Sequence, residues 1–280
     1  MRYRSGNPCY RKNTSPVTVF KLVVSYRGAD FCGWQKQSNG NSLQETVEEA
    51  LARILCEQTG VIASGRSDAG VHSLGQVVAF RTGVNRSAEN IRQGLNGLFP
   101  DSVRVLSVQK VSDDFHPQFQ AKKKAYRYLV QNTSVANPLL SPYAYFFPEK
   151  LNLKKMRQAA AYLVGRHDFT AFQASGLRPS KAASSAEGGR KVNDPVRTIY
   201  NLTVREESSD LFRTVGLVGV TVVGSGFLYK MVRNIVGTLL EVGRGKIRPE
   251  AVQEILESGD RRKAGKTMPA HGLTLLWVKY

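Results

Sequence analysis

Apolar and polar positions in the first half of the chain follow two different periods. Residues 17–26 are rich in Val and Phe and alternate loosely, which predicts a strand. Ser42 and Glu45 have the spacing of a capping box, and a helix is expected to begin there. The apolar stripe of this helix consists of Leu43, Val47, Ala50, Leu51, Ile54 and Leu55. Three more strands are expected at 61–65, 76–81 and 103–111, and a helix capped by Ser87 is expected at 87–98.

The segment 27–41 separates the first predicted strand from the first predicted helix. It contains several Gly and Asn residues, which interrupt regular structure. We therefore predict a loop in which Trp34 is exposed.

The second half begins with another alternating segment, a strand at 122–131, followed by a connection rich in proline. The segment 176–194 is poor in apolar residues and rich in Ser, Gly, Ala and Lys, and it is expected to be a mobile surface loop. The remaining pattern predicts helices at 153–164, 225–242 and 249–258, and strands at 196–205, 212–222 and 273–278.

The order of these elements predicts an α+β fold with a mixed, largely antiparallel sheet flanked by helices. The two halves look like loose duplicates, so two similar α/β subdomains are expected. Their boundary is placed near Ser112, giving an N-terminal subdomain at 17–112 and a C-terminal subdomain at 113–280. A polar, basic arm at 1–16 precedes them and is expected to be disordered.

The net charge of the chain indicates what kind of partner it binds. The 280 residues include 40 Lys and Arg against 22 Asp and Glu, a net charge of +18. Cations that face phosphates release condensed counterions, so this excess favours a nucleic acid partner. The alternative is a basic surface that only aids solubility.

Other features exclude several classes of protein. The three Cys and four His are scattered, whereas a structural zinc site needs about four clustered ligands. The odd, sparse Cys count is typical of a reducing compartment, which indicates a cytoplasmic protein. No apolar run approaches the roughly 20 residues that span a bilayer, so no membrane association is expected.

The most unusual stretch is GRSDAGVHSLGQ, at 65–76. Arg66 and Asp68 are two positions apart, so in an extended chain both side chains point to the same side. The guanidinium would favour an ionised carboxylate, and the small Ala69 and Gly70 would let a bulky ligand approach it. This combination suits nucleophilic or base chemistry. An ordinary Asp-Ala-Gly turn with Arg66 as the ion-pair partner of Asp68 explains the spacing equally well.

The second stretch, AKKKAYRYLV at 121–130, interleaves cations with aromatic residues. Alternation places Lys122, Lys124, Tyr126 and Tyr128 on one face of the strand. Such a face suits RNA, since the cations meet phosphates and a ring can stack on a base. The alternative is a half-exposed strand whose tyrosines pack on the core.

The third stretch, GSGFLYKMVRNIVG, combines a buried stripe with a small, cationic face formed by Gly226, Lys230, Arg233 and Gly237. A ligand could lie close against this face, or the cations could simply be solvated. In the fourth stretch, MPAHGLTLLWV, a Pro/Gly loop enters a strand, and Leu273 would by default belong to the core.

These four stretches together resemble the tRNA pseudouridine synthase A (TruA) family, from about Val19 to Tyr280. The family's Arg-Thr-Asp-Ala-Gly-Val-His motif matches 66–72, with Ser67 in place of Thr as the sole departure. Ser67 keeps the hydroxyl group, so little consequence is expected. Three further family motifs match at 124–128, 232–237 and 272–273.

The resemblance implies the pseudouridine synthase fold with a central cleft, and a role for each site residue. Asp68 would be the nucleophile, Arg66 would help to hold the flipped nucleotide, and Arg233 would pair with Asp68. Tyr126 would stack on the target uracil and Leu273 would close the apolar side of the base pocket. Further contacts to the RNA are expected from Lys124 and Lys230.

The implied reaction isomerises uridine to pseudouridine without a redox change, so neither an organic cofactor nor a metal is expected. Whether Asp68 attacks C6 of uracil or C1′ of ribose, or assists the loss of a ribose proton, is left open by the sequence. The family's substrate is the anticodon stem-loop of tRNA, at positions 38, 39 and 40, and its working form is a homodimer.

Three other functions compete with this interpretation. A non-catalytic RNA-binding protein would explain the charge and the Lys/Tyr strand, but not the combination of Arg66, Asp68 and a small-residue turn. A related synthase could act on a different RNA site. A metal-dependent nuclease would need clustered carboxylates, and the acidic pair Asp113-Asp114 is better explained as a solvated loop.

Overall fold

The computed structural model describes residues 16–38, 40–174, 194–208 and 216–280. The chain divides into two compact units. Unit 1 comprises the chain up to Lys122 together with Thr274–Tyr280, and unit 2 comprises Lys123–Leu273. Of the predicted arm at 1–16 only Pro16 is described, and of the predicted loop at 176–194 only Asp194 is described. The other residues of both segments lie outside the described residues. Ser112, the predicted subdomain boundary, lies within unit 1.

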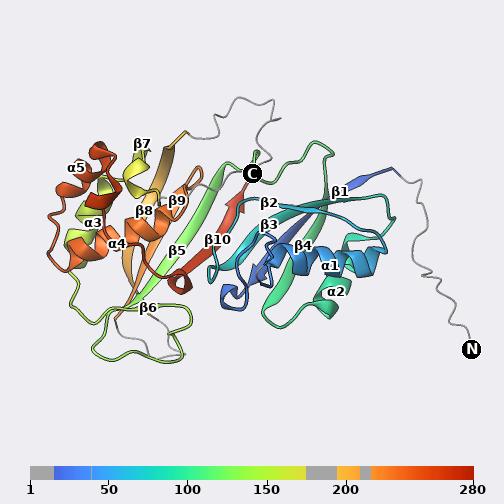
Figure 1. The fold of residues 1–280 in the computed structure, drawn as a ribbon, viewed down its shortest axis with the longest axis horizontal. Helices are drawn as coiled ribbons and strands as arrows, with labels where there is room; N and C mark the ends of the chain where they lie inside the picture. The colour runs from blue at the N-terminus through green and yellow to red at the C-terminus, as the bar shows by residue number, and fades with distance from the viewer. Residues whose placement is uncertain (1–15, 39, 175–193, 209–215) are drawn as a thin grey trace, which may run out of the picture. The chain divides into compact units, whose positions relative to one another are not determined.

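The sheet of unit 1 is built around β1, an alternating apolar strand as predicted. β1 pairs antiparallel with β3 on one side and with β4 on the other, and β3 pairs antiparallel with β2 and parallel with β10. The parallel pair joins the first third of the sequence to its last residues (Figure 1). The bounds are β1 Thr18–Tyr26, β2 Val61–Ala63, β3 His72–Thr82, β4 Val103–Val111 and β10 Leu273–Lys279.

Two helices, α1 (Leu43–Leu55) and α2 (Ala88–Leu98), lie side by side against this sheet (Figure 1). Both predicted caps are confirmed, because the Ser42 hydroxyl accepts from the backbone N–H of Glu45 (3.2 Å) and Ser87 accepts in the same way at α2. Capping satisfies backbone donors that the first turn leaves without a partner, which is why these helices begin there.

The predicted exposure of Trp34 is wrong. Its side chain is only 2% exposed and belongs to the hydrophobic core of unit 1. The backbone N–H of Trp34 donates to the carbonyl of Ser67 (3.1 Å), and its own carbonyl accepts from Gln44 (2.9 Å). These two bonds satisfy the polar backbone of Trp34, so burying its large indole carries no unsatisfied peptide group with it.

In unit 2, the strands β5, β9, β8 and β7 follow one another in antiparallel pairs. The short β6 pairs parallel with β5. Neither β6 nor β7 was predicted, since strands of two and four residues carry no readable alternation. The bounds are β5 Lys123–Gln131, β6 Tyr145–Phe146, β7 Gly165–Asp168, β8 Val196–Glu207 and β9 Leu217–Gly224.

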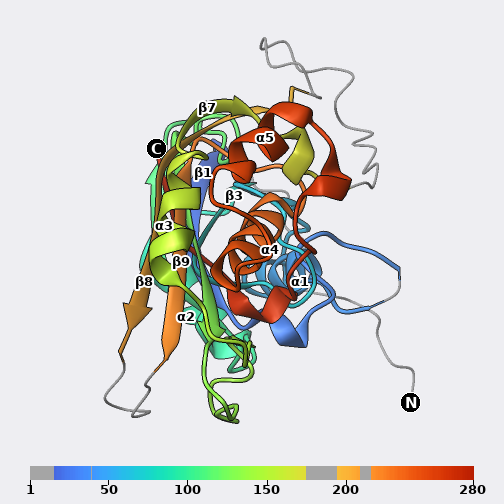
Figure 2. The same ribbon diagram turned by 90° about the vertical axis from the view of Figure 1, so that its left-hand side faces the viewer.

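Three helices pack against these strands of unit 2: α3 (Leu153–Ala161), α4 (Met231–Gly243) and α5 (Ala251–Ser258). Figure 2 shows α4 and α5 on the same side of β8 and β9. Most residues of α4 are buried, so α4 is the central helix of the unit rather than a surface helix. Unit 1 also contains the short 3-10 helix η1 (Gly28–Asp30). Unit 2 contains three others, η2 (Thr170–Phe172), η4 (Arg261–Lys263) and η5 (Ala270–Gly272).

The predicted start of the long helix at Ser225 is wrong by six residues. The backbone N–H of Ser225 donates to the carbonyl of Thr198 on β8 (2.9 Å), so Ser225 still belongs to the edge of the sheet. Lys230 then adopts a left-handed conformation (φ +57°), which a helix cannot continue through, and α4 begins at Met231.

The arrangement confirms the predicted α+β fold with mixed, largely antiparallel strands and flanking helices. Among the residues that the structure describes, no helix combines the length and apolar character needed to cross a membrane.

Candidate active site

Asp68 lies in the loop between β2 and β3, whose backbone is tied into unit 1. The carbonyl of Ser67 accepts from the N–H of Trp34 (3.1 Å), and the Ser67 hydroxyl lies 2.8 Å from the Tyr26 hydroxyl. Ser67 is buried, Arg66 is exposed and Asp68 is half-buried. A buried residue, Ser67, thus separates Arg66 from Asp68, both of which are partly or fully exposed.

Two glycines shape the turn that carries Asp68. The N–H of Val71 donates back to the Asp68 carbonyl (3.2 Å), and Gly70 has a φ of +80°. Gly33 has a φ of +110°, and a Cβ on it would lie 3.0 Å from the Ser67 carbonyl oxygen. A side chain at position 33 would be strained at this φ and would press on the backbone that carries Asp68.

Buried polar side chains support the same loop from below. Gln76 donates to the carbonyl of Gly65 (2.8 Å) and accepts from the hydroxyl of Ser64 (2.7 Å). Burial raises the pKa of Tyr26 to about 12, although its hydrogen bonds to Ser67 and Gln76 act in the opposite direction. The Tyr26 phenol is thus protonated at neutral pH and remains a hydrogen-bonding partner for Ser67.

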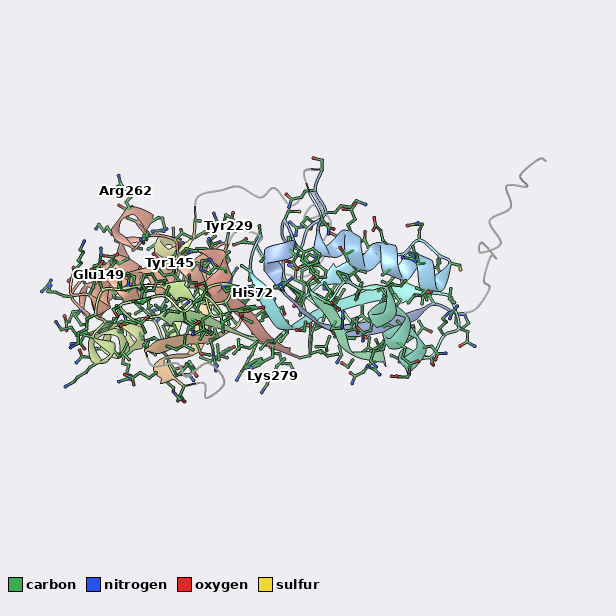
Figure 3. The ribbon with its side chains drawn as sticks, turned by 90° about the horizontal axis from the view of Figure 1, so that it is seen from below. His72, Tyr145, Glu149, Tyr229, Arg262 and Lys279 are labelled. Atoms are coloured by element: carbon green, nitrogen blue, oxygen red, sulfur yellow. The ribbon has the colours of Figure 1, made fainter. Side chains whose placement is uncertain are left out.

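His72, the last residue of the motif, has a structural role that the sequence did not reveal. It is buried, and its Nδ1 accepts from the backbone N–H of Gly28 (3.0 Å). Figure 3 labels its position at the start of β3. Nδ1 must be unprotonated to accept, so the imidazole links the loop before α1 to β3.

The predicted aromatic face of β5 separates into a buried and a half-buried part. Tyr128 is fully buried, its hydroxyl donates to the carbonyl of Pro269 (2.9 Å), and burial raises the pKa of its phenol. For Tyr128 the core interpretation is therefore correct. Tyr126 is half-buried and meets Phe227 edge-on, with ring centroids 5.2 Å apart. Lys124 lies on the same strand, opposite Gly224 of β9.

Arg233 lies in the first turn of α4 and is bound to the segment that precedes β10. Its Nε donates to the carbonyl of Met268 (2.6 Å), and the N–H of Met268 donates to the Arg233 carbonyl (3.3 Å). This bidirectional contact fixes the base of the guanidinium. Lys230, directly before the helix, has its ammonium 4.9 Å from the centroid of the Tyr229 ring.

The prediction of one small, cationic helix face needs correction. Gly226 precedes the helix and cannot share a face with Arg233. Gly237 is buried, and a Cβ on it would clash with the carbonyl oxygen of Lys266. The small residue at 237 therefore admits the chain's own backbone and needs no external ligand.

The segment 268–273 connects these residues. Leu273 is buried at the first position of β10, and Gly272 before it packs directly against the Tyr128 ring. Burial lowers the pKa of the His271 imidazole, and the positive charge of Arg233 lowers it further. Figure 3 labels Tyr145, whose ring centroid lies 6.4 Å from that of His271. His271 was missed because no spacing in the sequence linked it to Arg233.

The structure thus assembles the predicted residues in two groups. Unit 1 holds Arg66 and Asp68 on one anchored loop. Unit 2 holds the others on β5, at the start of α4 and at the start of β10: Lys124, Tyr126, Lys230, Arg233 and Leu273. The pairing of Arg233 with Asp68 stays a prediction.

Within 16–38, 40–174, 194–208 and 216–280, no group of three or more His, Cys, Asp or Glu side chains could hold a metal ion.

Comparison with known proteins adds independent findings. A family model described as tRNA pseudouridine synthase matches residues 22–120 and 159–280. The chain is 40% identical to tRNA pseudouridine synthase A of Acetivibrio thermocellus, over 93% of this chain and 98% of that protein. It is 43% identical to tRNA pseudouridine synthase A of an Exiguobacterium species, over 93% and 97% of the two chains. It is 37% identical to tRNA pseudouridine synthase A 2 of Clostridium perfringens, over 93% and 98%.

Proposed function

The chain belongs to the tRNA pseudouridine synthase family, and from that premise we propose that it converts uridine to pseudouridine at positions 38, 39 and 40 of the tRNA anticodon stem-loop, with Asp68 as the nucleophile. The single observation that supports Asp68 most strongly is its loop. Its neighbour Ser67 is buried and bonded through both hydroxyl and carbonyl, while Asp68 remains half-exposed. A reactive group on a rigid backbone is held near its productive geometry.

The proposed chemistry needs positioning and proton transfer only. The C1′–N1 bond breaks, the uracil rotates, and a bond forms between C1′ and C5. The proton on C5 leaves and N1 gains one, so substrate and product have the same composition and oxidation state. Asp68 would attack C6 of uracil or C1′ of ribose, or assist the loss of a ribose proton.

The remaining residues receive the roles that the family resemblance implies. Tyr126 would stack on the extruded uracil, which recovers part of the few kcal/mol lost when a base leaves its stack. Arg66 would help to hold the flipped nucleotide, and Arg233 would pair with the carboxylate of Asp68. Leu273 would form the apolar side of the base pocket. Phosphate contacts are assigned to Lys124 and Lys230.

The global charge supports an RNA substrate, since a net charge of +18 favours a polyanion. The proposal includes a homodimer in the cytoplasm as the working form, both expected from family membership. Size measurement by light scattering tests the dimer independently of activity.

The function is tested by incubating the purified protein with unmodified tRNA transcripts and mapping pseudouridine by mass spectrometry. We expect product at positions 38, 39 and 40, and none with Asp68→Asn, whose tRNA affinity should stay within severalfold of wild type. Product at other positions would identify a synthase with a different site. Tight tRNA binding without any product would favour the non-catalytic RNA-binding alternative, and robust turnover by Asp68→Asn would remove Asp68 from the mechanism.

A further inference from the structure

A buried polar network lies directly beside Arg233 on α4. Asn234 is 0% exposed, and its Nδ2 donates to the carbonyl of Phe172 (2.7 Å). Its Oδ1 accepts from Nη2 of Arg261 (3.0 Å) and from Oγ1 of Thr267 (2.6 Å). The amide of Asn234 thus connects α4 to η2 on one side and to the segment 261–267 on the other.

Arg261 makes an unusual contribution to this network. The same Nη2 also donates to Oγ1 of Thr267 (3.1 Å), and Nη1 donates to the carbonyl of Ala264 (3.2 Å). Among the described residues, no carboxylate pairs with Arg261, and burial lowers the pKa of its guanidinium. The guanidinium instead uses its fork of donors on three neutral acceptors, a geometry that a lysine could not reproduce.

The network controls the chain segment that orients Arg233. Gly265, which lies between Arg261 and Thr267, is also bonded to α4, because its N–H donates to the hydroxyl of Thr238 (2.9 Å). Met268 directly follows Thr267, and its carbonyl accepts from Nε of Arg233. The position of the Met268 carbonyl therefore depends on how the segment 264–268 is bonded to α4.

We propose that Arg261 is a positioning residue for the reaction: through Asn234 and Thr267 it holds the Met268 carbonyl where it orients the Arg233 guanidinium. This inference rests on the proposed function for the role of Arg233 in the reaction. The orientation itself is a property of unit 2 and is observable without substrate.

The neighbouring residue provides a matched control. Arg262 has the same charge and lies next to Arg261, but its side chain is 90% exposed and binds Asp260 of its own turn. Figure 3 shows Arg262 extending away from unit 2. Replacing it removes one positive charge from the same region without touching the network.

The first experiment compares Arg261→Gln, Arg261→Lys and Arg262→Gln. We expect both Arg261 variants to lower the single-turnover rate of pseudouridine formation by about tenfold, since a shift of less than 1 Å in a positioned group costs that much. Their dissociation constants for tRNA should stay within about twofold of wild type, because the Arg261 guanidinium is engaged by Asn234, Thr267 and Ala264. Arg262→Gln should match wild type in rate. A merely structural role would lower the melting temperature and leave the rate of the folded enzyme unchanged.

Thr267 tests the same network if the Arg261 variants do not fold. Thr267→Val removes the hydroxyl at constant shape and should lower the single-turnover rate by about threefold to tenfold. Thr267→Ser restores the hydroxyl and should recover wild-type turnover. Equal rates for the two Thr267 variants would overturn the proposal.

A measurement without substrate separates this inference from the proposed function. The Nε–H signal of Arg233, assigned by its absence from the NMR spectrum of Arg233→Lys, should exchange slowly in wild type and rapidly in Arg261→Gln. Unchanged exchange together with a wild-type rate in Arg261→Gln would overturn the positioning role, as would a loss confined to tRNA affinity. If the wild-type protein makes no pseudouridine, the proposed function is wrong. Faster Nε–H exchange of Arg233 in Arg261→Gln would then still show that Arg261 orients Arg233.

Discussion

The Asp68 loop of unit 1 and the first turn of α4 in unit 2 are held in place by different kinds of contact. The Asp68 loop depends mainly on backbone groups, including the Trp34–Ser67 bond and the close approach of Gly33. Arg233 depends on buried side chains, since Asn234 and its partners fix the segment that carries Met268. The first arrangement is sensitive to an added Cβ atom, and the second is sensitive to the loss of a polar group.

The largest expected effect on stability is in unit 2. Asn234→Ala leaves the Phe172 carbonyl and the Arg261 guanidinium without their buried partner, and should reduce the free energy of unfolding by about 3 kcal/mol in urea titrations. Asn201→Ala on β8, where the side chain is exposed, is the control and should change it by less than about 0.5 kcal/mol. Equal stabilities of the two variants would mean that side chains do not hold this region.

In unit 1 the corresponding variant is Gly33→Ala. The new Cβ meets the Ser67 carbonyl in a backbone conformation that alanine rarely adopts, so the Asp68 loop must shift. We expect the single-turnover rate to fall by about thirtyfold and the free energy of unfolding by about 1–2 kcal/mol. Gly97→Ala in α2, where a Cβ has no neighbour within 4 Å, should retain full activity. A fully active Gly33→Ala enzyme would show that the loop tolerates movement.

A smaller effect is expected from the hydroxyl pair that anchors the Asp68 loop through Ser67. Ser67→Ala and Tyr26→Phe each remove the bond between the two hydroxyl groups, and each should reduce the free energy of unfolding by about 1 kcal/mol. The double variant should lose little more than either single variant, which a double-mutant cycle measures. If the losses of unfolding free energy in the two single variants were additive, each hydroxyl would contribute through contacts other than the bond between Ser67 and Tyr26.

The smallest effect concerns pH. The pKa of His271 lies below its ordinary value of 6.5 because of burial and then Arg233, so the unfolded chain takes up this proton more readily. Stability should therefore be lost as the pH falls below about 6.5 towards the folded pKa, and His271→Gln should lose less. The pKa of His116 in unit 1 is lowered by burial, without an arginine.

Added salt distinguishes the two histidines in that experiment. Salt should weaken the Arg233 contribution at His271, while the burial effect at His116 should persist. Acid titrations of His271→Gln and His116→Gln at low and high ionic strength provide the measurement. The same salt response in both variants would argue against an electrostatic influence of Arg233 on His271.

Much of the local structure could be predicted from the sequence, because its causes lie within a few residues of each other. Ser42 and Ser87 cap their helices through bonds to residues three positions away. The alternation of 103–111 predicted β4 with its observed bounds. The motif around Asp68 could be located as well, since its unusual residues are contiguous, although its catalytic role stays a proposal.

Two of the wrong predictions involve partners that are distant in the chain. Trp34 is buried because Ser67 and Gln44 satisfy its backbone, and neither contact is visible from the polar loop around it. The start of α4 is delayed because Ser225 is bonded to Thr198. Periodicity describes which face of an element is apolar, but it does not reveal which other segment satisfies a given polar group.

The sequence by itself determined the alternating strands, the capped helices, the family and the identity of the candidate reactive carboxylate. Only the tertiary structure decided that Gly237 admits the backbone of Lys266, and that Asn234 joins Arg261 to the helix of Arg233. The physical reason is that propensity and capping act over three or four residues, whereas hydrogen-bond satisfaction in a core depends on segments that folding alone brings together.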